Sequence, residues 1–135
     1  MKQSKPKFTL EQKDSTEADA AISNGLYTLK GRFWLEGPSG TFLGYGRVIL
    51  LERIKLYGSI SEAARSMGMS YRHAWDLVDS INKQARMPLV ETATGGKGGG
   101  GARLTDAGEL AVQAFWRLYA RFQQFLQEEA GRLEF

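Results

Sequence analysis

The sequence of 135 residues predicts a mainly α-helical domain with small β-hairpins. Apolar side chains recur at helical spacing in several segments, and these segments end at glycine or proline. Two glycine-rich stretches each separate a pair of short apolar runs, a pattern that is typical of β-hairpins. Because 42% of the residues are hydrophobic, a chain of this length can bury one core, and global disorder is not expected.

The first 24 residues differ in composition from the rest of the chain. They are polar, contain Pro6 and keep neither strand nor helix spacing, so we expect residues 1–24 to form a disordered arm. A short helix over 16–23 is the alternative. Residues 25–135 are expected to form a single domain, which begins with a predicted strand over 26–35, a turn over 36–40 and a return strand over 41–43.

Two helices are predicted to follow. The first begins at Gly46 and ends at Gly58, with apolar side chains at helical spacing between them. The second spans residues 60–67, and Ser59 is expected to cap it by accepting the backbone N–H of Glu62 while the Glu62 carboxylate reaches back. Gly68 is expected to end this helix in the left-handed conformation that glycine adopts most easily.

A third helix is predicted from its cap, Ser70, to about residue 86, because Pro88 cannot continue it. Residues 89–94 and 102–104 are predicted strands, joined by a glycine-rich loop over 95–101.

The last predicted helix, over about 105–130, is capped by Thr105. Its apolar side chains at helical spacing are Ala111, Ala114, Phe115, Leu118, Phe122, Phe125 and Leu126. At 1.5 Å per residue this helix is about 35 Å long, comparable with the width of a small domain. We therefore expect part of its apolar face to pair with a second copy of the chain.

The order helix, short helix, glycine turn, longer helix and hairpin is that of a winged helix-turn-helix. In this architecture the helix after the turn enters the DNA major groove, and the hairpin, or wing, contacts the flanking backbone. Arg72 is suited to bidentate contact with guanine, whereas Ser70 and Tyr71 are suited to phosphate contacts. Lys97 and its glycines suit a wing tip that approaches phosphates closely. The predicted DNA-binding residues are Ser59, Ser70, Tyr71, Arg72, His73, Lys97, Gly98, Gly99 and Arg103.

These assignments have structural alternatives. Tyr71 is also a candidate packing residue, and His73 a candidate solvent-facing one. Asp76 is expected to orient Arg72 rather than to touch DNA, since a carboxylate repels phosphates. Trp75 is expected in the core, where it would lock its helix onto the preceding one. The wing has the alternative of a hairpin that makes no contact.

Charge and composition limit the function class. The net charge is +3, but residues 46–104 carry nine basic and five acidic side chains, net +4, and residues 105–135 carry three and five, net −2. A basic centre favours nucleic acid, with a solvated basic surface as the alternative. The chain has no cysteine, and His73 is its one histidine, so we expect no disulfide, no metal site and no catalytic site. The loop around Lys97 lacks the following Ser or Thr that a Walker phosphate loop needs.

Hydropathy predicts the compartment. No apolar run approaches the roughly 18 residues of a membrane helix, and the N-terminus lacks the apolar stretch of a signal peptide. We therefore expect a cytoplasmic protein without membrane contact.

Three segments of the chain resemble the ModE family of molybdenum-responsive transcriptional regulators. They are GSISEAARSMGMSYRHAWDLVDSIN over 58–82, LVETATGGKGGGGARLT over 89–105 and LEGPSGTFLGYGRVILLERI over 35–54. The resemblance covers roughly residues 26–127 and implies a LysR-type winged helix followed by a long helix that pairs subunits. It implies DNA contacts for Ser70, Tyr71, Arg72 and Lys97 with its glycines. Family members also carry C-terminal modules that bind molybdate, and these are not expected in this sequence.

Together these observations predict a homodimeric, sequence-specific DNA-binding transcriptional regulator. We expect it to repress genes of molybdate uptake or other molybdenum-related genes by reading a pseudo-palindromic operator in double-stranded DNA. The alternative is an interaction module that pairs with a full-length regulator. No cofactor is expected within the chain, and molybdate is left open as an effector, with the glycine-rich loop and Lys97 as a candidate anion nest.

Overall fold

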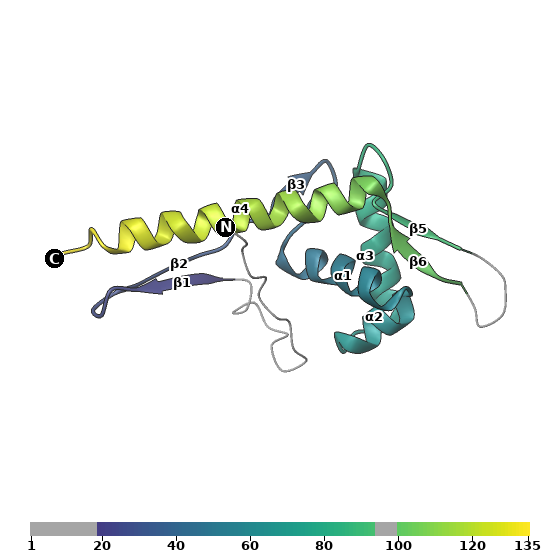
Figure 1. The fold of residues 1–135 in the computed structure, drawn as a ribbon, viewed down its shortest axis with the longest axis horizontal. Coiled ribbons are helices and arrows are strands. Elements are labelled where there is room, and N and C mark those ends of the chain that lie inside the picture. Colours follow the sequence, from purple (N-terminus) through teal and green to yellow (C-terminus); the bar gives the residue numbers. More distant parts are fainter. Residues whose placement is uncertain (1–18, 94–99) are drawn as a thin grey trace.

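A long helix at the C-terminus runs past a bundle of three shorter helices in the computed structural model, which describes residues 19–93 and 100–135 (Figure 1). Two small hairpins precede the three helices and a third follows them. The elements in chain order are β1 (Ala20–Ser23), β2 (Thr28–Gly31), β3 (Leu35–Gly37), β4 (Gly40–Leu43), α1 (Tyr45–Tyr57), α2 (Ile60–Ser66), α3 (Tyr71–Gln84), β5 (Val90–Thr92), β6 (Ala102–Leu104) and α4 (Asp106–Ala130).

The core is built around α1. Val48, Leu51 and Ile54 recur at helical spacing and are completely buried, so this face of α1 is in contact with the rest of the domain along its length. The helix ends at Gly58, whose φ of +71° allows its N–H to donate to the Ile54 carbonyl at 2.8 Å. The predicted boundaries of this helix are confirmed to within a residue or two.

The turn between α2 and α3 is formed as the sequence predicts. The Ser59 hydroxyl accepts the Glu62 N–H at 3.0 Å, and Gly68 has a φ of +67°. Ser70 caps α3 by accepting the His73 N–H at 3.0 Å. The Glu62 carboxylate forms an ion pair with Arg65 at 3.3 Å, whereas the capping box predicts a contact back to Ser59.

Strands β5 and β6 form an antiparallel hairpin against the end of α1. Glu91 lies opposite Arg103 in its register, and the Ala102 N–H donates to the Gly58 carbonyl at 2.9 Å. The order α1, α2, α3, β5, β6 is therefore a winged helix-turn-helix, as predicted. Residues 94–99, which are the last residue of the predicted strand over 89–94 and the first part of the predicted loop over 95–101, lie outside the described residues.

The N-terminal hairpin is a correction to the predicted arm. Residues 20–23 form β1, which pairs with β2 and lies along the C-terminal half of α4 (Figure 1). The Asn24 side chain closes the turn, accepting the Leu26 and Tyr27 N–H groups, and donates to the Ala130 carbonyl at 2.9 Å. Ile22 is the one large apolar side chain of β1, so the strand carries little hydrophobic signal, and contact with α4 stabilises it. Residues 1–18, the remainder of the predicted arm, lie outside the described residues.

The predicted strand over 26–35 is also corrected. It divides into β2, which pairs with β1, and β3, which pairs with β4. Phe33 lies between the two strands and stacks on Phe115 of α4, with ring centroids 5.1 Å apart. The alternation of apolar residues in this segment thus has two causes. Some of these residues lie in strands, and Phe33 packs against α4.

Helix α4 buries a different face from the predicted one. Phe115 and Leu126 are buried as expected, but Leu118 is 39% and Phe125 55% exposed. Trp116 and Tyr119 take the core side because their rings pack on Tyr45 of α1, with centroids 5.8 and 5.7 Å away. Because α4 carries aromatic side chains on both sides, sequence spacing did not distinguish the buried side.

Gly108, in the first turn of α4, packs closely against the start of the wing. A Cβ at this position would collide with the Leu89 carbonyl, whereas a Cβ at Gly46 on α1 would meet nothing within 4 Å. We expect Gly108→Ala to lower the free energy of unfolding by about 2 kcal/mol or more through overpacking. Gly46→Ala should raise it by roughly 0.5–1 kcal/mol through helix propensity. Urea unfolding of the two variants measures both values, and equal effects would contradict the close packing at Gly108.

Candidate nucleic-acid interface

The first two turns of α3 present a continuous exposed surface. Residues at positions i, i+1, i+4 and i+5 lie on one side of a helix, and here those positions are exposed. We call this surface the recognition face; it consists of Tyr71, Arg72, Trp75 and Asp76. His73 is also exposed and lies beside the face.

The opposite side of α3 holds the helix in place. Ala74, Val78 and Ile81 are buried in the common core, at most 1% exposed. The Arg47 guanidinium on α1 donates to the Ser80 hydroxyl at 3.0 Å. Burial lowers the pKa of Arg47, but an arginine stays charged at neutral pH. The recognition face is therefore carried by a helix whose rotation is set by the core.

The end of α3 is tied to the preceding hairpin. The Gln84 side chain donates to the Thr41 carbonyl at 2.9 Å and accepts the Ser39 N–H at 3.3 Å. On the last turn, a hydrogen bond from Lys83 to Asp79 raises the pKa of the Lys83 ammonium. These contacts lie at the end of α3 remote from the recognition face.

Two charged side chains on the recognition face pair with each other. Arg72 Nε lies 3.7 Å from Asp76 Oδ2, and the two side chains are 89% and 68% exposed. An exposed pair one helical turn apart contributes well under 1 kcal/mol, so the guanidinium is free to exchange this partner for another acceptor. The structure thus places Asp76 as the orienting partner that the sequence predicts for Arg72.

Trp75 does not belong to the buried core, so its predicted core position is wrong. The indole is 37% exposed on the recognition face, beside Tyr71, which is 54% exposed. Ala74 and Val78 occupy the core side, and the helical rotation of about 100° per residue turns Trp75 away from Ala74 toward the outer side. Tyr71 is about half buried, so its alternative as a packing residue stays open, and the solvent-facing alternative for His73 agrees with its exposure.

The predicted serines lie at the starts of α2 and α3. Each serine hydroxyl accepts a hydrogen bond from the backbone N–H of the residue three positions later in the chain, so Ser59 and Ser70 both act as helix N-caps. Their hydroxyl protons are separate donors, which are suited to phosphate oxygens. The Ser59 hydroxyl also lies 3.5 Å from that of Ser61.

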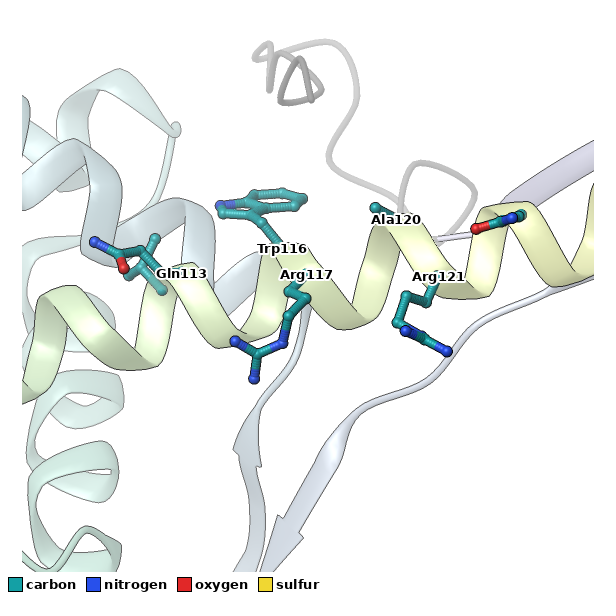
Figure 2. Close-up of a pocket in the computed structure, with 7 residues that line it drawn as sticks. Gln113, Trp116, Arg117, Ala120 and Arg121 are labelled. Carbon is teal, nitrogen blue, oxygen red and sulfur yellow. The ribbon is translucent and has the colours of Figure 1, made fainter. Parts of the chain in front are cut away.

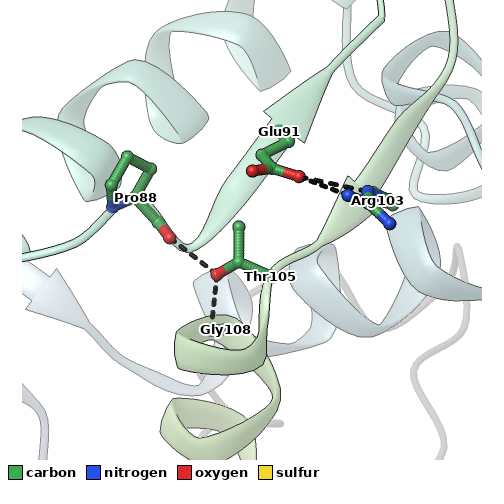
Figure 3. Close-up of polar contacts among 5 residues, drawn as sticks. All are labelled: Pro88, Glu91, Arg103, Thr105 and Gly108. Carbon is green, nitrogen blue, oxygen red and sulfur yellow. Dashed lines mark hydrogen bonds and ion pairs between the residues drawn. The ribbon is translucent and has the colours of Figure 1, made fainter.

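The wing presents one of its predicted contact residues. Arg103 donates through Nε and Nη2 to one oxygen of Glu91 on the opposite strand, at 3.1 and 2.8 Å (Figure 3). Behind this pair, the Thr105 hydroxyl donates to the Pro88 carbonyl at 2.6 Å and accepts the Gly108 N–H (Figure 3). The base of the wing is thereby joined to the first turn of α4. Lys97, Gly98 and Gly99 lie outside the described residues.

Asn82 connects α3 with the wing, a role that the sequence did not predict. Its side-chain carbonyl accepts the Leu89 and Val90 N–H groups at 2.9 and 3.1 Å, and its amide donates to the Val90 carbonyl at 3.0 Å. One amide side chain thus satisfies three backbone groups at the start of β5. A polar residue near the end of a helix is too common a signal to have identified this contact.

A shallow groove of about 430 Å³ lies on α4, away from the recognition face. Trp116 and Ala120 lie along one side of it, and Arg117 and Arg121 along the other (Figure 2). Among the residues that the structure describes, no group of three or more acidic or histidine side chains is placed to hold a metal ion.

The comparisons with known proteins agree with this geometry. Residues 47–109 match the model of the bacterial regulatory helix-turn-helix protein, lysR family. The "DNA-binding transcriptional dual regulator ModE" of Escherichia coli (strain K12) is 49% identical over 78 residues, which is 58% of this chain and 29% of that protein. The "Molybdenum transport protein ModE" of Azotobacter vinelandii is 40% identical over 102 residues, 76% of this chain and 38% of that protein.

A third relative is the "Molybdenum-pterin-binding protein MopB" of Rhodobacter capsulatus, 46% identical over 88 residues, 65% of this chain and 33% of that protein. The chain thus spans about a third of the length of the curated relatives that it matches. In the described residues, no helix combines the length and the apolar character of a membrane span. The names of the matching family and of the Escherichia coli relative both refer to regulation.

The joint between α3 and the wing is open to a direct test. Asn82→Ala leaves three partly buried backbone groups without their partner, so we expect it to lower the free energy of unfolding by about 2–3 kcal/mol. Asn82→Asp keeps the acceptor for two N–H groups and should cost less than the alanine variant. Urea unfolding gives the two values, and a loss under about 0.5 kcal/mol for Asn82→Ala would contradict the role of Asn82.

Proposed function

We propose that this chain, which carries a LysR-type helix-turn-helix and is homologous to ModE regulators, is a sequence-specific DNA-binding transcriptional regulator. The observation that supports this most strongly is the recognition face. It exposes a guanidinium, two aromatic rings and a carboxylate on a helix that the core holds from behind. A helix of this kind fits the width of the major groove.

Each predicted residue has a role in the proposed complex. Arg72 leaves Asp76 and grips guanine with two hydrogen bonds, while Ser70 and Tyr71 donate to phosphate oxygens. Arg103, half of an exposed ion pair, contacts the flanking backbone from the wing. Ser59 and His73, and Lys97, Gly98 and Gly99 in the loop beyond the described strands, complete the proposed contact surface.

The exposed side of α4 is proposed as the surface that pairs two copies. Ala111, Leu118 and Phe125 recur at intervals of seven residues; Ala111 packs against the core, and Leu118 and Phe125 continue this stripe as exposed side chains. If two α4 helices cross antiparallel about a two-fold axis, a register that places Ala114 opposite Phe125 also places Leu118 opposite Arg121. The small side chain of Ala114 then faces the large ring of Phe125, and the aliphatic part of Arg121 covers Leu118.

A two-fold dimer accounts for the proposed operator. Two recognition helices related by this axis would read half-sites about 34–36 Å apart, or a multiple of that distance, so the operator would be a pseudo-palindrome. Occupying both half-sites excludes other proteins from that stretch of DNA, which is the basis for proposing repression.

The proposed target genes follow from the relatives. Their names refer to molybdenum transport and to transcriptional regulation, so we propose that this protein controls molybdenum-related genes. We place it in the cytoplasm, because the DNA that it would bind is there. Lys97 and the glycines beside it lie outside the described residues, so molybdate binding by them stays a prediction.

Arg72 should determine sequence preference. A duplex selected from a random pool serves as the specific site and a scrambled duplex as the control. We expect Arg72→Ala to lose about 1–3 kcal/mol of affinity for the selected duplex and little for the scrambled one. Fluorescence anisotropy measures both affinities over a series of salt concentrations.

Arg132, an exposed arginine beyond the end of α4, provides the matched control. Arg132→Ala should leave both affinities unchanged. Wild-type binding should weaken steeply as salt rises, because phosphate contacts release counterions. Equal losses on both duplexes for Arg72→Ala, or binding that does not respond to salt, would contradict the proposal.

The pairing surface should be separable from the fold. Both Leu118 and Phe125 are exposed, so Leu118→Asp combined with Phe125→Asp should keep the unfolding temperature while sedimentation shows monomers. Affinity for a two-half-site duplex should then fall by about 100-fold or more, and affinity for a single half-site should not change. Leu56→Asp, at an exposed leucine on α1, is the control and should leave the dimer intact.

A wild-type chain that is monomeric at micromolar concentration would overturn the homodimer. If such a chain nevertheless pairs with a full-length homologous regulator, the stripe on α4 serves a hetero-complex, which is the alternative function.

A further inference from the structure

Trp75 is a large apolar side chain on the one surface of α3 that faces away from the core. The indole is 37% exposed, although a tryptophan gains much from burial. The fully buried positions of α3 are Ala74, Val78 and Ile81, and Trp75 is not one of them.

Two other exposed aromatic side chains, at Trp34 and Tyr27, have partners within the chain. Trp34 donates through Nε1 to Glu36 at 3.1 Å, and the Tyr27 ring lies 5.6 Å from that of Phe135. For Trp75 and Tyr71, neither a hydrogen bond nor a ring contact is formed within the described residues 19–93 and 100–135. The outer part of the Trp75 side chain is therefore available to a ligand.

The charge beside Trp75 indicates which part of DNA it faces. Asp76 adjoins it and is 68% exposed, and a carboxylate at this point repels phosphates. This part of the recognition face is thus unfavourable for the DNA backbone. It suits base edges in the groove.

One base edge matches an indole. In the major groove thymine presents a C5 methyl group, whereas the other bases present only hydrogen-bonding groups and aromatic C–H. We infer that Trp75 contacts the methyl group of a thymine and so adds a second base preference to that of Arg72. This inference rests on the proposed DNA-binding function.

The spacing along α3 places the two contacts close together. Arg72 and Trp75 are three residues apart, or about 4.5 Å along the helix axis. Successive base pairs are about 3.4 Å apart. Trp75 therefore reads a thymine one or two base pairs from the guanine that Arg72 contacts, once in each half-site.

Replacing thymine by uracil removes this methyl group and nothing else. Each thymine of a half-site is replaced in turn in the selected duplex, and affinities are measured for the wild type and for Trp75→Ala. At one thymine per half-site, uracil should weaken the wild type about fourfold, the value expected for one buried methyl group. The same replacement should leave the affinity of Trp75→Ala unchanged.

Two further variants make the result specific. Trp34→Ala removes an exposed tryptophan outside α3 and should keep the full uracil effect. Trp75→Phe keeps an aromatic surface and should show a smaller uracil effect, and it replaces Trp75→Ala if the alanine variant fails to fold by circular dichroism.

The outcomes separate the two claims. Suppose that the wild type selects a sequence while each uracil replacement lowers its affinity by the same factor as that of the Trp75 variants. In that case the inferred thymine contact is wrong and the DNA-binding function stands. If the wild type selects no sequence, the proposed function and this inference both fail.

Discussion

Val48, Leu51 and Ile54 on α1 are completely buried, and the elements that carry the recognition face and the wing pack on this apolar face or on a neighbour of it. Burying one such side chain is worth roughly 1.5–3 kcal/mol, so three of them account for a stabilisation comparable with the net stability of a small domain. Helix α2 packs on α1, α3 packs on α2, and β6 is joined to the end of α1 by the hydrogen bond at Gly58. The position of each later element thus depends on α1.

The same constraint determines which side chains of α3 are available for function. Once Ala74, Val78 and Ile81 are buried, the rotation of the helix leaves Arg72, Trp75 and their neighbours outside. Asn82 then fixes the start of β5 to the other end of α3. The end of α3 and the start of β5 are therefore joined directly by hydrogen bonds, and such a fixed joint reduces the entropy lost when both elements contact one ligand.

Helix α4 combines two tasks along its length. Its first half packs aromatic rings on α1, and its second half is covered on one side by the β1–β2 hairpin. The Asn24 amide satisfies the Ala130 carbonyl at the end of the helix, where the last carbonyls lack helical partners. With the core side and the hairpin side occupied, the stripe with Leu118 and Phe125 is left to face outward.

The order of elements was predictable because local physics decides it. Glycine at a positive φ ends α1 and α2, and serine or threonine caps the starts of α2, α3 and α4. The winged helix-turn-helix and the Arg72–Asp76 pair follow from such short-range signals. Asn82 could not be predicted in this way, because its partners belong to another element.

The sequence alone determined the helix boundaries, the glycine turn and the candidate contact residues of α3. The tertiary structure decided that Trp75 faces outward, that α4 buries Trp116 and Tyr119, and that residues 20–23 form a strand. The physical reason is that a side chain at helical spacing is buried only if a neighbouring element covers it. That element is distant in sequence, so its position is known only when the chain has folded.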